Sequence, residues 1–295
     1  MTPDKNSNAW KRWGEADEAG ALNYVRPDCV KHAAGLVRTG KIISLAQSIF
    51  PGMAIPGHRA GMSHFMGRDG GDYAAGARSP GGFQFAEDTV IMPLHIGTHV
   101  DALCHCWYDD TLFNGFPASG IRSTKGAEHC GVETMPPVLT RGVLLDFVAL
   151  TGARLADGAA IDDDLLRRAL STAGVELKSG DVVLLRTGWL ESQSTPSTVS
   201  FDTEPGIDVS AAQYLADCGV AMIGADNFAV EVLPFAPGTI FPVHQLVIRD
   251  FGIPLLEGLV LDRLANEGRS TFAFVAAPLP IKGGTGSPLN PLAVL

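Results

Sequence analysis

Three histidines and one aspartate lie within residues 95–105, close enough to share one site: His95, His99, Asp101 and His105. The surrounding β-forming residues, with a proline and a glycine, favour an extended chain over a helix. Alternate residues of an extended chain face the same side, which predicts that His95, His99 and Asp101 share one face. Two imidazoles and one carboxylate can bind Zn²⁺, Mn²⁺ or Fe²⁺ while leaving positions free for water and substrate. The pattern therefore predicts a catalytic metal site.

His105 follows Asp101 by four residues and is expected just beyond the end of that strand. Imidazole titrates near the working pH of most enzymes, so this side chain suits proton transfer to and from a reacting group. Gly97 has the same parity as the predicted ligands and is expected to leave open space between the two imidazoles. The opposing interpretation treats these residues as ordinary polar side chains of a strand. Four such groups within eleven residues favour the site.

The elements that must position this segment alternate between strands and helices. A helix is expected from Asp28 to about Val37, and two more from Asp162 to Leu170 and from Ser210 to about Cys218. Apolar runs predict strands at 41–46, 142–148, 181–187, 220–225, 253–259 and 271–276. This alternation predicts an α/β fold with a mixed β-sheet and flanking helices. We expect one domain over residues 1–295, with an N-terminal arm of about residues 1–27.

Two further segments could reach the site. Residues 51–87 are rich in Gly, Pro and Ser, which favours a loop over the metal ligands. His64 lies in this stretch and could contact substrate or be a plain loop histidine. Trp10 and Trp13 suggest that the arm is docked, and Trp13 could wall an apolar substrate pocket in this subunit or a neighbouring one. Simple packing of the arm is the alternative.

The composition excludes several classes of function. The chain has 295 residues and a net charge of −10, without a basic run, so no nucleic-acid partner is expected. No apolar stretch of membrane-spanning length occurs, and therefore no membrane association is expected. The N-terminus is polar, and the five cysteines lack the spacing of a disulfide scaffold. These features predict a cytoplasmic protein acting on a small-molecule substrate.

The motif His95-x-Gly97-Thr98-His99-x-Asp101-Ala102-x-x-His105 resembles the signature of the cyclase family of metal-dependent hydrolases, which includes bacterial kynurenine formamidase and isatin hydrolase. Leu103 stands where the family usually has proline, as in a longer subfamily whose members are mostly uncharacterised. Similarity to that subfamily extends to the segments 10–23, 141–146, 180–189 and 286–290. The resemblance implies a swivelling β/β/α fold and a homo-oligomer, either a dimer or a tetramer.

The resemblance also implies a second metal position. His244 and Glu257 resemble a distal pair that helps to hold a second ion, with Asp101 bridging the two ions. Their spacing is one residue off the family pattern, so one ion or two remain open. Glu257 interrupts an apolar strand, where a buried carboxylate is costly unless it is paired or binds metal, although exposure at a strand end is the alternative. Asp226 resembles an aspartate that orients the strands of the site, which favours a structural role.

These observations together predict hydrolysis of an amide, imide, lactam or lactone, with the C–N bond of a cyclic or formamide-type substrate favoured. One or two Mn²⁺ or Zn²⁺ ions would supply a metal-bound hydroxide to attack the carbonyl, and His105 would transfer protons. No Gly-x-Ser-x-Gly motif is present, which disfavours a serine hydrolase. The first rival is a non-haem iron oxygenase using His99, Asp101 and His244. The second is a metal-binding family member without activity.

Overall fold

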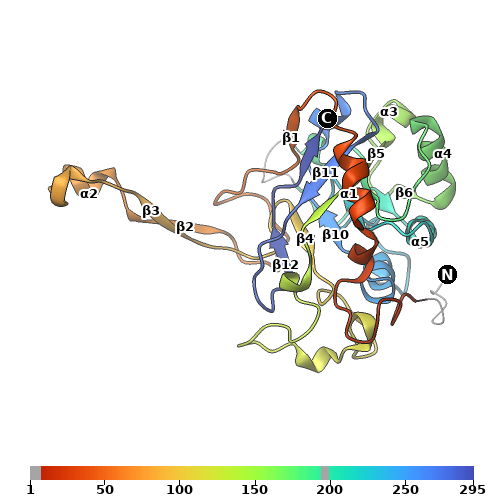
Figure 1. Ribbon diagram of the computed structural model, residues 1–295, viewed down its shortest axis with the longest axis horizontal. Coiled ribbons are helices and arrows are strands. Elements are labelled where there is room, and N and C mark those ends of the chain that lie inside the picture. Colours follow the sequence, from red (N-terminus) through yellow and green to blue (C-terminus); the bar gives the residue numbers. More distant parts are fainter. Residues whose placement is uncertain (1–7, 194–198) are drawn as a thin grey trace.

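The computed structural model describes residues 8–193 and 199–295, and a nine-stranded mixed sheet forms its centre (Figure 1). The strand order is β1-β13-β11-β5-β7-β9-β10-β4-β12. In that order the strands are Ile42–Ser44, Leu292–Val294, Thr271–Ala276, Val138–Asp146, Val182–Arg186, Met222–Ala225, Leu255–Glu257, His99–Asp101 and Gly286–Pro288. The predicted α/β class, with a mixed sheet and flanking helices, is confirmed.

The centre of the sheet is parallel and its two sides are antiparallel. Strands β5, β7, β9 and β10 run parallel to their neighbours in this group, whereas β11 and β4 pair with it in the antiparallel sense. All four residues of β9 and the first four of β7 are buried. Continuous burial is typical of parallel strands covered on both faces, which explains the uninterrupted apolar runs in their sequences.

Short helices cover the sheet. The α-helices are α1 (Pro27–Ala34), α2 (Gly70–Ala74), α3 (Phe147–Thr151), α4 (Asp163–Ala173), α5 (Val209–Asp217), α6 (Pro242–His244) and α7 (Asp262–Ala265). The 3₁₀ helices are η1 (Gly20–Tyr24), η2 (Pro80–Gly82), η3 (Phe113–Gly115), η4 (Ala118–Gly120), η5 (Val132–Thr134) and η6 (Leu190–Ser192), and η8 (Gln245–Asp250) is a π-helix. Helix α1 packs on β5 and β11, and α4 packs on β5 and α5. Among the described residues, no helix combines the length and the apolar character needed to cross a membrane.

Capping side chains explain where the helices begin. Asp162 accepts a hydrogen bond from the backbone N–H of Leu165, as predicted for the start of α4. The helix expected to begin at Asp28 and run to about Val37 covers Pro27–Ala34 instead, so Arg26, not Asp28, stands at its N-cap position. Asp28 lies instead in the first turn, where a carboxylate still favours the positive end of the helix dipole.

Residues 51–87 do not form one loop over the site. Their second half belongs to a hairpin in which β2 (Ser63–Arg68) pairs with β3 (Glu87–Ile91), and α2 lies near its tip. Figure 1 shows this hairpin extending far from the body of the molecule. Between residues 47 and 91, only the part from 47 to 59 borders the cavity described below, which other segments of the chain also line.

The arm before α1 is docked on the body. The Trp10 indole N–H donates a hydrogen bond of 2.9 Å to the carbonyl of Arg249, whose guanidinium lies 4.4 Å above the Trp10 ring. The Ala9 N–H donates to the carbonyl of Asp250. The arm therefore holds the end of η8, the helix that follows His244.

Asp226 joins the ends of two parallel strands. One carboxylate oxygen accepts hydrogen bonds from the Thr187 N–H at 2.9 Å and the Thr187 hydroxyl at 2.7 Å, and the other accepts from the Gly188 N–H at 2.7 Å. Burial raises the pKa of Asp226 to about 6, although these three hydrogen bonds oppose the shift. The contacts are structural, in line with the role that the sequence favoured.

The variant Asp226→Asn should destabilise the fold. An amide replaces one acceptor oxygen with a donor, so at least one buried N–H or hydroxyl loses its partner, which costs about 1–3 kcal/mol. Urea unfolding at pH 8, where the wild-type carboxylate is ionised, measures the change. Asp217→Asn, at the exposed end of α5, is the matched control and should leave stability within about 0.5 kcal/mol. Equal midpoints for the two variants would contradict this role.

Candidate metal centre

Strand β4 carries two of the predicted ligands and lies between β10 and β12. The antiparallel register places Glu257 of β10 directly opposite His99, and Gly286 of β12 directly opposite Asp101. His99 and Asp101 are two residues apart on one strand and therefore share a face, as predicted. The sheet thus brings a carboxylate from a distant part of the sequence beside the local pair.

His95 reaches the same place by a different route from the one expected. Strand β4 begins only at His99, so residues 95–98 are not part of an extended face. Gly97 has a φ of +56°, a left-handed conformation that turns the chain. Because Gly97 has no side chain, Met53 and Ile49 can pack close to its backbone. The open space expected between the two imidazoles is therefore not what this glycine provides. The prediction of one continuous strand was wrong, but the bend still brings His95 Nδ1 within 2.8 Å of Asp101 Oδ1.

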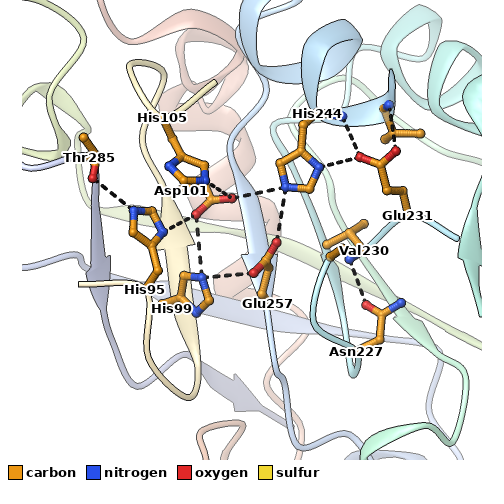
Figure 2. Close-up of polar contacts among 12 residues, drawn as sticks. His95, His99, Asp101, His105, Asn227, Val230, Glu231, His244, Glu257 and Thr285 are labelled. Carbon is orange, nitrogen blue, oxygen red and sulfur yellow. Dashed lines mark hydrogen bonds and ion pairs between the residues drawn. The ribbon is translucent and has the colours of Figure 1, made fainter. Parts of the chain in front are cut away.

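Two three-residue groups of potential metal ligands result, and Asp101 belongs to both. The first group is His95, His99 and Asp101, and the second is Asp101, His244 and Glu257. His99 Nε2 lies 3.7 Å from Asp101 Oδ1, while His244 Nε2 lies 3.6 Å from Asp101 Oδ2. Figure 2 shows Asp101 between the two groups, with one oxygen facing each.

Each of these imidazoles is oriented by a contact at its other nitrogen. His95 Nε2 hydrogen-bonds to Thr285 Oγ1 at 3.0 Å, and His99 Nδ1 donates to the carbonyl of Gly97 at 3.0 Å. Such contacts set the tautomer and leave the remaining nitrogen free to bind metal. Gly286 assists here, because a Cβ at this position would lie 2.6 Å from His95 Cε1.

His244 has the strongest orienting contact. Its Nδ1 donates to Glu231 Oε1 at 2.5 Å, and the same carboxylate accepts from the backbone N–H groups of Val243 and His244. Glu231 is only 1% exposed. The resulting carboxylate–histidine pair directs His244 Nε2 toward Asp101 and Glu257, as Figure 2 shows.

The residues present fit a divalent cation. His99 Nε2 and Asp101 Oδ2 are both fully buried and lack a hydrogen bond of good geometry. Each faces an opposite charge instead, His99 Nε2 at 3.0 Å from Glu257 Oε2 and Asp101 Oδ2 at 3.6 Å from His244 Nε2. Burial alone would lower the pKa of His99 and His244, but the attraction of neighbouring carboxylates outweighs it and raises the pKa of both. The carboxylates therefore favour a positive charge at this place. A metal ion held by the neutral imidazoles would supply that charge and would bind His99 Nε2 and Asp101 Oδ2.

His105 lies at the edge of the two groups. Its ring is 4.1 Å from that of His95, and its Nε2 is 4.0 Å from Asp101 Oδ2. Burial lowers the pKa of His105 to about 4, with Asp101 opposing the shift, while 29% of the side chain stays exposed. A neutral imidazole that solvent reaches, beside but not within the two groups, can accept a proton.

A cavity of about 180 Å³ opens on one side of the centre. His95, His99 and Glu257 form part of its wall, and aromatic side chains form much of the rest. His105 is not among the residues that line it. A substrate in this cavity would therefore meet the first ligand group directly.

The structure brings together six of the eight predicted site residues, namely His95, His99, Asp101, His105, His244 and Glu257. It does not bring His64 or Trp13 there within one chain. His64 lies on the hairpin, 2.6 Å from Asp88, and Trp13 packs edge-to-face on Tyr24 in the arm.

Two orienting residues escaped the sequence reasoning. Glu231 carries no local signal, because only the fold brings it to His244 from thirteen residues away. Thr285 precedes a segment noted for its resemblance to the family, Gly286 to Asn290, so its neighbourhood was a usable indication. Its contact with His95 spans 190 residues and could not be read from spacing.

The fold and these side chains define an α/β protein with a candidate metal centre. Residues 25–232 match the family model described as "Putative cyclase", and the protein belongs to that family. An isatin hydrolase from Roseibium aggregatum is 27% identical over 228 residues, which cover 72% of this chain and 75% of that protein.

Solved structures are similar in fold. A crystal structure described as a novel cyclase is 36% identical, with a TM-score of 0.91 and 99% of each chain covered. Isatin hydrolase A from Labrenzia aggregata, bound to benzyl benzoate, has a TM-score of 0.62 at 24% identity, covering 88% of this chain and 94% of that chain. The relatives support hydrolase activity at the level of the family, and the recognition of the family from the motif is confirmed.

Replacing Glu257 by glutamine should remove about one equivalent of bound divalent metal and leave the first ligand group occupied. Glutamine keeps the shape of the side chain but removes the charge that the second group presents to a cation. Elemental analysis of the purified variant, set against wild type, measures the stoichiometry. Unchanged metal content would show that the second group holds no ion.

The double variant His95→Ala/His99→Ala is the complementary test. It removes two of the three ligands of the first group and leaves the second complete, so metal lost here should be the equivalent that Glu257→Gln retains. His64→Ala, on the distant hairpin, is the control and should retain the full wild-type complement. Full retention in the double variant would contradict the first group.

Proposed function

We propose that this protein is a metal-dependent hydrolase of an amide, imide, lactam or lactone, with the C–N bond of a cyclic or formamide-type substrate favoured. The observation that carries the proposal is the convergence of three oriented imidazoles and two buried carboxylates beside a cavity. Imidazole and carboxylate donors suit Mn²⁺ and Zn²⁺ alike, in one ion or two. Kinship with isatin hydrolase supports the same reaction type.

Each group in the centre has a distinct part in this reaction. A divalent ion held by the two ligand groups would supply an activated water nucleophile and would polarise the carbonyl of the substrate. Thr285 and Glu231 hold the ligand histidines so that they need no reorientation when substrate binds. His105, which is neutral at working pH, accepts the proton of the nucleophile and returns it to the leaving nitrogen or oxygen.

The oxygenase alternative is less well supported. It requires His99, Asp101 and His244 to act as one facial triad. Asp101 instead turns a different oxygen to each of these histidines, and His95 and Glu257 complete two separate groups. Oxygen consumption by the Fe²⁺-loaded protein would favour that alternative. A lack of turnover on every substrate of the panel below would favour a metal-binding protein without activity.

The variant His105→Asn should keep its metal and lose turnover. Removal of a general acid–base group costs about 10²- to 10⁴-fold in rate, whereas removal of a ligand also costs metal affinity. Rate and metal content are measured on the same preparation, with a panel of cyclic amides, imides, lactones and formamides. His32→Ala, exposed on α1, is the control and should match wild type.

Two outcomes would contradict the role of His105. Loss of metal from His105→Asn would make this residue a ligand. Retention of both metal and full rate would make it a bystander and require another base.

We also propose that the protein is a homo-oligomer in which the hairpin of β2 and β3 packs on a second copy. A two-stranded hairpin is marginally stable alone in water. The pairing of Ser63 with Ile91 and of Phe65 with Thr89 puts Phe65 and Ile91 on one face. These two side chains are 58% and 65% exposed. Leaving this apolar surface in contact with water is unfavourable, which indicates that another molecule covers it.

The double variant Phe65→Ser/Ile91→Ser should therefore convert the oligomer into a monomer of about 31.1 kDa. Polar side chains on this face remove the apolar area that a second copy would bury. Light scattering after size exclusion measures the mass, and metal content reports whether the body stays folded. His64→Ala, on the opposite face of the hairpin, should leave the mass unchanged. A wild-type monomer would refute the proposal.

A further inference from the structure

The polar side chains that line the cavity are mostly committed to the protein itself. The amide nitrogen of Gln47 donates to the carbonyl of Gly258, that of Asn227 donates to Pro205, and that of Gln193 donates to Trp189. These amides hold the walls of the cavity in place. Among the described lining residues outside the ligand groups, Arg59 is the one that carries a charge.

Arg59 has little inside the protein to satisfy its charge. Its Nη1 donates to the backbone carbonyl of His95 at 2.7 Å, and its guanidinium lies 5.3 Å from the centre of the Phe228 ring. No carboxylate of the described residues forms an ion pair with it. A guanidinium has five N–H donors in a planar fork that matches a carboxylate, and the hydrogen bond to His95 uses only one.

The position of Arg59 relates it directly to the metal centre. Its anchor is the backbone of His95, whose side chain belongs to the first ligand group. A substrate group bound by Arg59 would therefore lie beside the residue that carries a ligand imidazole. The only carboxylate in the described lining is Glu257, which belongs to the second ligand group.

The remaining walls are aromatic and apolar. Phe228 contacts Phe201 edge-to-face at 5.2 Å, and Trp189 lies 6.1 Å from Phe201. Phe50 lines the same cavity from the loop that carries Arg59. Such walls suit a flat aromatic body, which gains both burial and ring contacts.

From this arrangement we infer that Arg59 selects the substrate: it binds a carboxylate adjacent to the scissile bond of an aromatic amide. The aromatic body packs against Phe201 and Phe228, and the scissile carbonyl faces His95 and His99. This inference rests on the proposed hydrolase function and adds to it the chemical class of the substrate.

A matched substrate pair tests the inference, namely oxanilate and its neutral carboxamide, N-phenyloxamide. Both release aniline when the anilide C–N bond is hydrolysed, so aniline is the product measured, and they differ only in the group beside the scissile carbonyl. Arg59→Gln should lower kcat/KM for oxanilate by about 10- to 100-fold and change that for N-phenyloxamide by less than about threefold, since a hydrogen-bonded charge is lost only in the first case. Arg59→Lys should recover part of the loss. Arg38→Gln, at an exposed position, should match wild type.

Binding gives a readout that does not depend on turnover. Calorimetry compares benzoate with benzamide on the metal-loaded protein and after chelation of the metal. Wild type should prefer benzoate in both states, and Arg59→Gln should lose that preference while metal content stays unchanged.

Several outcomes would overturn the inference. One is an equal loss of rate on both substrates, and another is a loss of metal from Arg59→Gln; either would make Arg59 a mere support for the His95 backbone. A benzoate preference that survives in Arg59→Gln would also overturn it. If wild type hydrolyses neither of these substrates nor any member of the panel described above, but shows the benzoate preference through Arg59, the proposed hydrolysis fails while the anion site stands.

Discussion

The concentration of buried carboxylates is the constraint on which the rest of the structure depends. Asp101, Glu231 and Glu257 are each 3% exposed or less. Asp101 belongs to both ligand groups, and Glu257 belongs to the second. Burying such charges costs several kcal/mol each unless hydrogen bonds or opposite charges compensate. The surrounding imidazoles supply part of this compensation, and a divalent cation would supply the rest. Neighbouring features, from the register of β4 to the contact of Glu231 with His244, serve to hold these charges in place.

The chain meets this constraint by placing the ligands on rigid elements. His99, Asp101 and Glu257 sit on paired strands, so backbone hydrogen bonds fix their spacing. His244 lies where α6 passes into the π-helix η8, a wide turn of the kind that often marks a functional site. The docked arm holds the other end of η8 through Trp10. The position of His244 is thus supported from both sides, by Glu231 near its ring and by the arm at the end of its helix.

Local patterns in the sequence predicted the parts of this site that lie close together along the chain. The apolar runs identified the central strands, and the spacing of His99 and Asp101 identified a shared face. Resemblance to the family, not physical reasoning from the sequence, pointed to His244, whereas Glu257 was noticeable because it interrupts an apolar strand. The bend at Gly97 was missed because a glycine in an extended-looking segment does not reveal a left-handed conformation. Glu231 and Thr285 were missed because their contacts exist only once the fold has formed. The hairpin was taken for a loop because the Gly-rich connection hid two short strands.

Recognition and chemistry are divided between different kinds of structure in this molecule. The ligand groups lie mainly on strands and helices, where small displacements are resisted by the packed sheet. The cavity walls come largely from connecting segments, among them residues 47–59, the stretch after β7 and the turn after β9. Such segments tolerate substitution better than the elements they join, so substrate preference can change while the centre stays intact. Arg59 lies at the boundary, because it belongs to a loop and yet holds the backbone of a ligand histidine. A change at this position therefore affects which group is recognised beside the centre, while the orientation of the His95 ring still depends on Thr285 and Asp101.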